Sequence, residues 1–377
     1  MTWRSNRRPP RCMFLTVGAT VLLTIAAGAC SSASTAGTTT ARSTASASSV
    51  EGPATETSPP PTTSGPATTA PPFIAASTTS STAPATTTTL FDVYSHTGVG
   101  QMSPAVANAK AYVYVPSNSD GSVTVIDQQT MTVVKHYNVG RLVQHVVAGW
   151  DLTKLYATAS GSNRLVEIDP ATGDKGASIR VAAPYNLYFT PDGSTAIVMA
   201  ERLNRMDFYD RLTWKLRFSV RTPCTGINHA DWSVDGAWFM ATCEFSGQLL
   251  KVDTATGEIL GVVPLAKGAM PQDIRLAPDG TKFYVADMEH NCVWIVDGDG
   301  TTVTGSIETG VGTHGIYPSR DGTLMYVTNR GRMEHDTHRR SRPGDGSVSV
   351  IDPRTDTVVA TWQIPDGGSP DMGGVSA

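Results

Sequence analysis

The chain has few charged residues, few aromatic residues and few cysteines for its length. Only 16% of its 377 residues are charged, 7% are aromatic and 5 are cysteine. The first 29 residues contain four arginines and no acid, which leaves 25 Lys and Arg against 33 Asp and Glu in the rest of the chain. This acidic balance argues against a nucleic-acid-binding surface, which requires clustered positive charge.

Three common functional signatures are missing as well. The sequence contains no G-x-x-x-x-G-K phosphate loop, no G-x-S-x-G nucleophile elbow and no H-E-x-x-H zinc motif. The apolar run at residues 13–27 is shorter than the roughly 20 residues of a membrane-spanning helix. No local motif therefore indicates a reaction, and the sequence requires no cofactor.

The first 30 residues have the pattern of an export signal. The arginine-rich start precedes the apolar run, and residues 27–30 read Ala-Gly-Ala-Cys. This junction is similar to a lipobox, in which Cys30 becomes an acylated amino terminus, although Ala27 stands where Leu is usual. We predict a signal peptide over residues 1–29 and a lipoprotein on the outer face of the cell membrane. Cleavage after Ala29 and plain secretion is the alternative.

Residues 31–90 consist almost entirely of Ser, Thr, Pro, Ala and Gly. Such a composition buries too little apolar surface to offset the entropy lost on ordering. We therefore predict that residues 30–94 form a disordered tether that starts at the lipidated Cys30. The globular domain is predicted over residues 95–377.

A unit of about 43 residues recurs through the globular part. Its clearest copy, residues 267–310, contains four short runs rich in β-branched and aromatic residues, separated by Gly, Asp and Pro. Its Asp-Gly turn at residues 279–280 recurs at 192–193, 235–236 and 321–322. Four strands per repeat predict an all-β propeller of four-stranded antiparallel blades.

Six complete units can be counted, and a seventh begins. They cover residues 101–140, 141–182, 183–223, 224–266, 267–310 and 311–366. Residues 371–377 match the start of a further unit at residues 272–278. We predict six complete blades plus the first strand of a seventh, in an open arc. This pattern fits a truncated or frameshifted seven-bladed propeller, or a six-bladed ring with a surplus strand.

The segment Tyr326-Val327-Thr328-Asn329, followed by Ser-Val-Ile-Asp at residues 349–352, resembles the repeat of the YVTN, YncE-like β-propeller family of extracytoplasmic proteins. The resemblance covers about residues 95–377. It implies a propeller fold and a binding or surface protein, and it implies no particular reaction, since one fold serves many functions.

Polar residues recur where the first strands of successive blades begin. In a propeller these positions lie at the mouth of the central channel, on the face that also carries the loops between second and third strands, here called the top face. The predicted ligand-binding residues are His145, Asn186, His229, Asp273, His314 and Asp371. We predict that they bind a protein, glycan or small-molecule ligand without catalysis. The alternative is that they only pair with backbone groups or hold water.

An enzymatic alternative also stays open. Propellers of similar construction include metal- or tetrapyrrole-dependent oxidoreductases and lactonases, which use rings of His and Asp. The candidate metal ligands are His229, His314, His335 and His338. The last two lie in an arginine-rich insertion at residues 332–345 that lengthens a top-face loop.

Cys224 and Cys243 both fall at the top of the predicted fourth blade. In an exported protein we expect them to form a disulfide. A soft-metal site that also uses His229 is the alternative. Cys292 begins a predicted strand, and we expect it to be buried and free.

We predict that mass spectrometry of the mature protein will find Cys30 as its first residue, carrying acyl chains. Two or more chains would hold the protein stably on a membrane, because one chain gives only reversible binding. An unmodified Cys30 terminus, or a retained Met1, would contradict the lipoprotein hypothesis.

Overall fold

The structure, a computed structural model, describes residues 92–331, 345–365 and 368–375. These residues belong to one compact unit, Ala83–Ala377. Cys30, nearly all of the predicted tether and the insertion residues His335 and His338 lie outside the described residues. No helix in the described part is long and apolar enough to cross a membrane.

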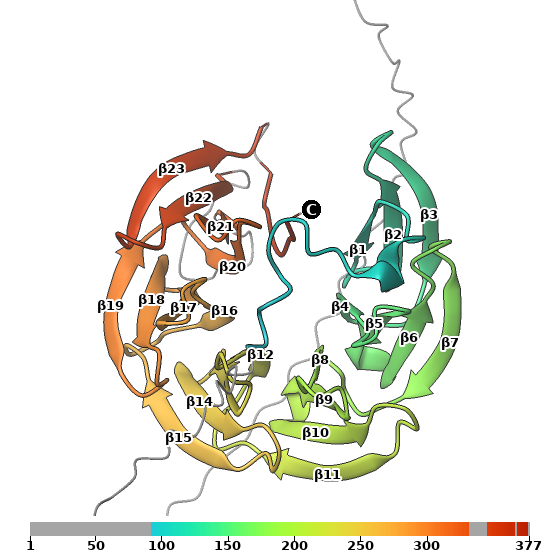
Figure 1. The fold of residues 1–377 in the computed structure, drawn as a ribbon, viewed down its shortest axis with the longest axis horizontal. Helices are drawn as coiled ribbons and strands as arrows, with labels where there is room; N and C mark the ends of the chain where they lie inside the picture. Colours follow the sequence, from blue (N-terminus) through green and yellow to red (C-terminus); the bar gives the residue numbers. More distant parts are fainter. Residues whose placement is uncertain (1–91, 332–344, 366–367, 376–377) are drawn as a thin grey trace, which may run out of the picture. The chain divides into compact units, whose positions relative to one another are not determined.

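Six antiparallel sheets are arranged as the blades of a propeller (Figure 1). Blade 1 has β1 (Tyr112–Pro116), β2 (Ser122–Asp127) and β3 (Thr132–Asn138). Blade 2 has β4 (Val143–Ala148), β5 (Leu155–Ala159), β6 (Arg164–Ile168) and β7 (Lys175–Arg180). Blade 3 has β8 (Asn186–Phe189), β9 (Thr195–Ala200), β10 (Arg205–Asp210) and β11 (Leu216–Arg221).

The second half of the propeller repeats the same order. Blade 4 has β12 (Ile227–Trp232), β13 (Trp238–Cys243), β14 (Gln248–Asp253) and β15 (Ile259–Pro264). Blade 5 has β16 (Pro271–Leu276), β17 (Lys282–Asp287), β18 (Cys292–Asp297) and β19 (Val303–Glu308). Blade 6 has β20 (Thr313–Pro318), β21 (Met325–Asn329), β22 (Ser347–Asp352) and β23 (Thr357–Gln363). The predicted all-β propeller of six antiparallel blades is confirmed.

One detail of blade 1 differs from the prediction. Its sheet has three strands, and the 3-10 helix η1 (Pro104–Val106) occupies the segment expected to form the first strand. Pro104 has no N–H to give to a sheet, and the Ser103 side chain accepts a hydrogen bond from the Ala105 N–H. These local bonds favour a helical turn. Two more 3-10 helices, η2 (Ser160–Ser162) and η3 (Glu201–Leu203), follow the second strands of blades 2 and 3.

The Asp-Gly pairs close the turns between the first and second strands. Gly193, Gly236, Gly280 and Gly322 all have φ between 67° and 71°, which side chains disfavour. In each turn the Asp side chain accepts a hydrogen bond from the N–H two residues later, for example Thr281 N–H to Asp279 at 3.0 Å. The turn chemistry therefore fixes the strand boundaries that the sequence repeat marks.

The core lies between the blades, where each sheet packs on its neighbour. Met199, Met206 and Phe208 of blade 3 pack with Ile227 and Phe239 of blade 4, and all five side chains are fully buried. Comparable clusters join blades 1 and 2, 2 and 3, 4 and 5, and 5 and 6. Each blade thus depends on its neighbours to bury its two faces.

A threonine at the end of the second strand links three of the blades to the neighbouring segment of the chain. Thr158, Thr242 and Thr328 each accept a hydrogen bond from an N–H of the first strand of their own blade. Each also donates to a carbonyl beyond its own blade: Tyr185, Gln272 and Asp371, respectively. Thr328 is the threonine of the Tyr-Val-Thr-Asn motif, so this motif residue is an inter-blade bridge.

Residues 371–373 do not form the predicted strand, but they contact blade 6 as the first strand of a further blade would. The Thr328 bond to the Asp371 carbonyl matches that of Thr242 to Gln272. The Gly373 N–H donates to the Tyr317 hydroxyl at 2.8 Å, as the Ala230 N–H donates to Tyr188 at 3.0 Å. Among the described residues no other sheet lies between this segment and β1 (Figure 1).

We expect Thr242→Val to lower the free energy of unfolding by about 1–3 kcal/mol, because it leaves the Gln272 carbonyl of the next blade without the Thr242 donor. The His229 N–H keeps its 2.8 Å bond to the Asn228 side-chain oxygen. Urea unfolding measures this loss. The control is Thr361→Val on the exposed face of β23, for which a change within about 0.5 kcal/mol is expected. Equal effects of the two substitutions would contradict the bridging role.

Candidate functional site

Four of the predicted site residues lie at irregular positions of the first strands. The pairing of β4, β12, β16 and β20 with their second strands shifts register after Val143, Ile227, Pro271 and Thr313. His145, His229, Asp273 and His314 fall within these irregular steps. Bulges of this kind redirect side chains and are frequent beside functional sites.

His145 and His229 form an aromatic cluster with Tyr185. The two imidazole centroids are 5.1 Å apart, and Tyr185 lies 5.3 Å from His145 and 5.9 Å from His229, all edge to face. His229 is 1% exposed, yet neither of its ring nitrogens has a protein partner among the described residues, and Nε2 of His145 has none either. Three imidazole nitrogens are therefore buried without a hydrogen bond from the protein.

Both imidazoles are neutral at physiological pH. Burial, reinforced by the neighbouring His229, lowers the pKa of His145 to about 3. Burial and the charge of His314 lower the pKa of His229 well below its ordinary value. A neutral imidazole offers one donor and one acceptor nitrogen. The pair can therefore both give and accept hydrogen bonds at the channel mouth.

His314 and Asp371 pair with one another instead of remaining available. His314 Nδ1 lies 3.0 Å from Asp371 Oδ1, and Arg330 Nε donates to the same carboxylate at 2.8 Å. Burial raises the pKa of Asp371, but the hydrogen bond from His314 and the charges of His314 and Arg330 outweigh it and lower the pKa. The carboxylate is therefore ionised, and its Oδ1 atom is bound by His314 and Arg330 of this blade.

The side chains of Asp273 and Asn186 bind nearby backbone and side-chain groups. Asp273 accepts a hydrogen bond from the Ile316 N–H of the next blade at 3.0 Å and forms a 2.8 Å ion pair with Arg275. The Asn186 side chain donates to the Tyr188 hydroxyl at 3.0 Å and accepts from the Leu187 N–H. These contacts match the alternative stated above, in which the polar residues at the channel mouth pair with groups of the protein itself.

Glu201 and Glu244 were not among the predicted ligand-binding residues, but both are electrostatic neighbours of Tyr185. Burial raises the pKa of Glu244, which accepts a hydrogen bond from Asn228 at 2.9 Å. Burial and the charge of Glu244 raise the pKa of Glu201 to about 7. Both residues directly follow the second strand of their blade, β9 and β13. Their matching positions in adjacent repeats could have identified them from the sequence.

Cys224 and Cys243 are joined as a disulfide, with their Cα atoms 6.0 Å apart. Their sulfurs bond to each other, so they do not form the alternative metal site with His229. Cys292 is buried and free, and burial raises its pKa to about 12. Within the described residues, no three His, Cys, Asp or Glu side chains are placed to hold a metal ion. His335 and His338 lie outside that part of the chain.

A cavity of about 400 Å³ opens on the top face over blades 1–3. Loop residues that include Asp120, Arg141 and Arg202 line it. Both guanidinium groups donate to backbone carbonyls, Arg202 to Ser160 at 2.6 Å and Arg141 to Gly161 at 3.1 Å. The predicted top face is therefore hollowed beside the blade that carries His145.

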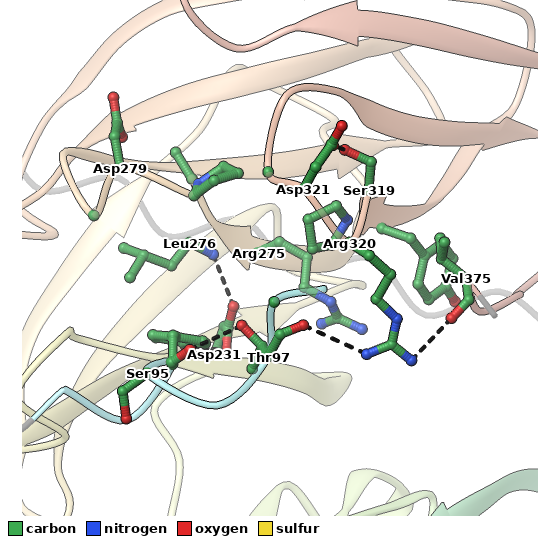
Figure 2. A pocket seen from close by; sticks show the side chains of 18 of the residues that line it. Ser95, Thr97, Asp231, Arg275, Leu276, Asp279, Ser319, Arg320, Asp321 and Val375 are labelled. Atoms are coloured by element: carbon green, nitrogen blue, oxygen red, sulfur yellow. Dashed lines mark hydrogen bonds between the residues drawn. The ribbon is translucent and has the colours of Figure 1, made fainter. Parts of the chain in front are cut away.

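A larger cavity, of about 750 Å³, lies at the opposite end, among the Asp-Gly turns of blades 5 and 6 (Figure 2). The segment at residues 92–98, here called the amino-terminal segment, forms one of its walls. Arg320 ties this segment to the chain end through the carbonyls of Thr97 and Val375, at 3.5 and 3.1 Å (Figure 2).

Tyr94 anchors the amino-terminal segment at this end of the channel. Its hydroxyl donates to Asp231 at 2.5 Å and lies 3.0 Å from the Trp232 carbonyl oxygen. Asp231 in turn accepts from the Leu276 N–H of blade 5 at 2.7 Å (Figure 2). Burial raises the pKa of Asp231. The sequence pattern places Tyr94 at the end of the predicted tether and gives no sign of this contact.

We predict that Glu201→Gln will gain stability relative to the wild type as the pH rises. The folded chain raises the Glu201 pKa from 4.5 to about 7, so the stability that this carboxyl contributes is fully present below pH 4.5 and is lost as the pH rises to about 7. Urea unfolding of both proteins at pH 5 and pH 8 measures the difference. The exposed Glu258→Gln is the control, and an equal difference at both pH values would contradict the prediction.

Comparison with known proteins shows which family the chain resembles. The family model of the YNCE-like beta-propeller matches residues 82–377. Hydrazine synthase of Kuenenia stuttgartiensis is 18% identical with a TM-score of 0.56, over 70% of this chain and 86% of that chain. A functionally unknown protein from Desulfotomaculum acetoxidans DSM 771 is 18% identical with a TM-score of 0.55, over 67% and 80%. No curated protein matches the chain.

At this identity the two solved structures show the shared fold and no function. The family model, in contrast, covers most of the sequence, including all six blades. The resemblance carried by the Tyr326-Val327-Thr328-Asn329 motif is therefore confirmed, and the chain belongs to the YNCE-like beta-propeller family.

Proposed function

We propose that this protein is an exported, lipid-anchored propeller that binds a ligand at the mouth of its channel on the top face, without catalysing a reaction. The observation that carries the proposal is the pair His145 and His229. Three of their four ring nitrogens are buried and have no partner among the described residues. Buried polar atoms are nearly always hydrogen-bonded, and each one left unpaired costs about 1–3 kcal/mol. A ligand that pairs with them would recover this free energy.

The neighbouring groups indicate what such a ligand must offer. The imidazoles are neutral, and a pKa of about 7 leaves much of the Glu201 carboxyl protonated near neutral pH. Burial also raises the pKa of Glu244. Groups of this kind both donate and accept hydrogen bonds. Tyr185 adds an aromatic surface beside both imidazoles. A polar, uncharged small molecule or a glycan with several hydroxyl or amide groups fits these properties best.

Two features support the extracytoplasmic location. The arginine-rich start, the apolar run and the Ala-Gly-Ala-Cys junction favour export and acylation of Cys30. The Cys224–Cys243 disulfide fits an oxidising compartment, since such bonds are rare in the cytosol. A tether of the predicted length would hold the propeller away from the membrane and leave its top face accessible.

The proposal is tested with His229→Phe in the full mature chain. The substitution keeps an aromatic ring but removes both unpaired nitrogens, so we expect the melting temperature of the free protein to stay equal or rise. In a thermal-shift screen of sugars, amino acids and polar metabolites, compounds that raise the melting temperature of the wild type should no longer do so for the variant. The exposed His136→Ala is the control, expected to respond like the wild type.

Two outcomes would overturn the proposal. If the compounds stabilise His229→Phe as strongly as the wild type, the channel mouth is not the binding site. If protein purified without chelators contains stoichiometric metal that His229→Phe loses, the metal-dependent enzymatic alternative replaces it.

A further inference from the structure

A second cavity of about 750 Å³ lies on the Asp-Gly-turn face, against the amino-terminal segment. Aromatic side chains from three blades and from this segment line it: Trp150, Phe189, Trp232, Tyr94 and His96. The turn and strand residues that carry them belong to blades 2, 3 and 4. This cavity is at the opposite end of the channel from the His145 and His229 cluster and is independent of the function proposed for that cluster.

Trp150 is held in one orientation although its side chain is 46% exposed. Its indole N–H donates to the Pro191 carbonyl at 3.2 Å, and the Arg211 guanidinium lies over its ring at 5.2 Å. A Cβ atom at Gly193 would come within 2.4 Å of the ring, so the ring lies directly against that turn. Arg211 itself is fixed by Asp151 at 3.0 Å. The exposed indole is therefore a rigid aromatic surface.

Trp232 contributes a hydrogen-bond donor that the protein leaves unused. Its side chain is only 8% exposed and packs against Tyr188 and Phe239. Its indole N–H has no partner among the described residues. Indole N–H groups are usually paired when they are buried. Because Trp232 lines the cavity, a ligand hydroxyl group that reaches this N–H would supply the missing acceptor.

Among the described residues that line this cavity there is no Lys or Arg. Asp92 and Asp231 line it together with Ser95, His96 and Thr190. Asp231 is occupied by Tyr94 and by the Leu276 N–H. Asp92 is exposed, and its side chain accepts a hydrogen bond from the Tyr94 N–H at 2.8 Å. A negatively charged ligand would face these carboxylates, and the nearby Arg211 is already paired with Asp151, so this lining disfavours it.

We propose that this cavity binds the neutral sugar rings of a polysaccharide. A pyranose presents an apolar C–H face that packs on a rigid aromatic ring such as Trp150, and hydroxyl groups that accept from an indole N–H or donate to a carboxylate such as Asp92. The volume is within the range of roughly 300–1,000 Å³ usual for small-molecule sites. The protein would then attach to a glycan through the face opposite to its proposed ligand site.

Isothermal titration of the full mature chain with cellohexaose, mannohexaose and maltohexaose tests this proposal, with tryptophan fluorescence as a second readout. We expect saturable binding of at least one of these neutral oligosaccharides, accompanied by a fluorescence change. Trp150→Ala should weaken its affinity about tenfold or more through loss of the stacking surface. Trp232→Phe, which keeps the buried ring and removes only the N–H, should weaken it about three- to tenfold.

Trp362→Ala is the matched control, because this tryptophan is 52% exposed on blade 6 and does not line the cavity. Its affinity should stay within about twofold of the wild type. Absence of saturable binding for all three oligosaccharides would overturn the proposal, as would unchanged affinity in Trp150→Ala. Binding of a proline-rich peptide that displaces no sugar but is lost in Trp150→Ala would assign the cavity to a protein partner instead.

Discussion

The free edges of the first strands are the constraint on which the channel depends. Each first strand pairs with the second strand of its own blade, and its other edge presents N–H and C=O groups that no sheet partner satisfies. Side chains of the neighbouring blade supply the bonds: Thr242 donates to the Gln272 carbonyl, Asp231 accepts from Leu276 N–H, and Asp273 accepts from Ile316 N–H. The channel is lined with polar residues because its backbone must be paired.

Some polar side chains at the channel are used up by this pairing, whereas others are left to bind a ligand. Asp273 and Asn186 are occupied by the backbone and by nearby side chains, and His314 is occupied by Asp371. His229 is equally buried, but among the described residues neither of its ring nitrogens has a partner. The Trp232 indole N–H at the other end of the channel also has none in this part of the chain. Unused buried groups, more than polar character alone, indicate where a ligand would gain binding free energy.

The fold could be predicted from the sequence because turns and strands depend on residues that are close together along the chain. The Asp-Gly turns require a positive φ that glycine tolerates, and the runs of β-branched residues between them favour strands, so period, blade number and family could be predicted from the residues alone. Pro104 shows the limit of such counting: the periodicity predicted a strand there, but a proline that lacks an N–H, together with a serine cap, formed a 3-10 helix.

The composition of the sites was decided only by the tertiary structure. Ile227 and Thr313 occupy the same position in their blades, so His229 is the second residue of the irregular step and His314 the first. That difference of one residue directs one imidazole to Tyr185 and the other to Asp371. Likewise Tyr94, Trp150 and Trp232 lie far apart in the sequence and meet only where the blades assemble around the channel. The sequence by itself determined the repeating blade, because turns and strands depend on neighbours along the chain, whereas partners across blades depend on register and packing, which only the assembled propeller sets.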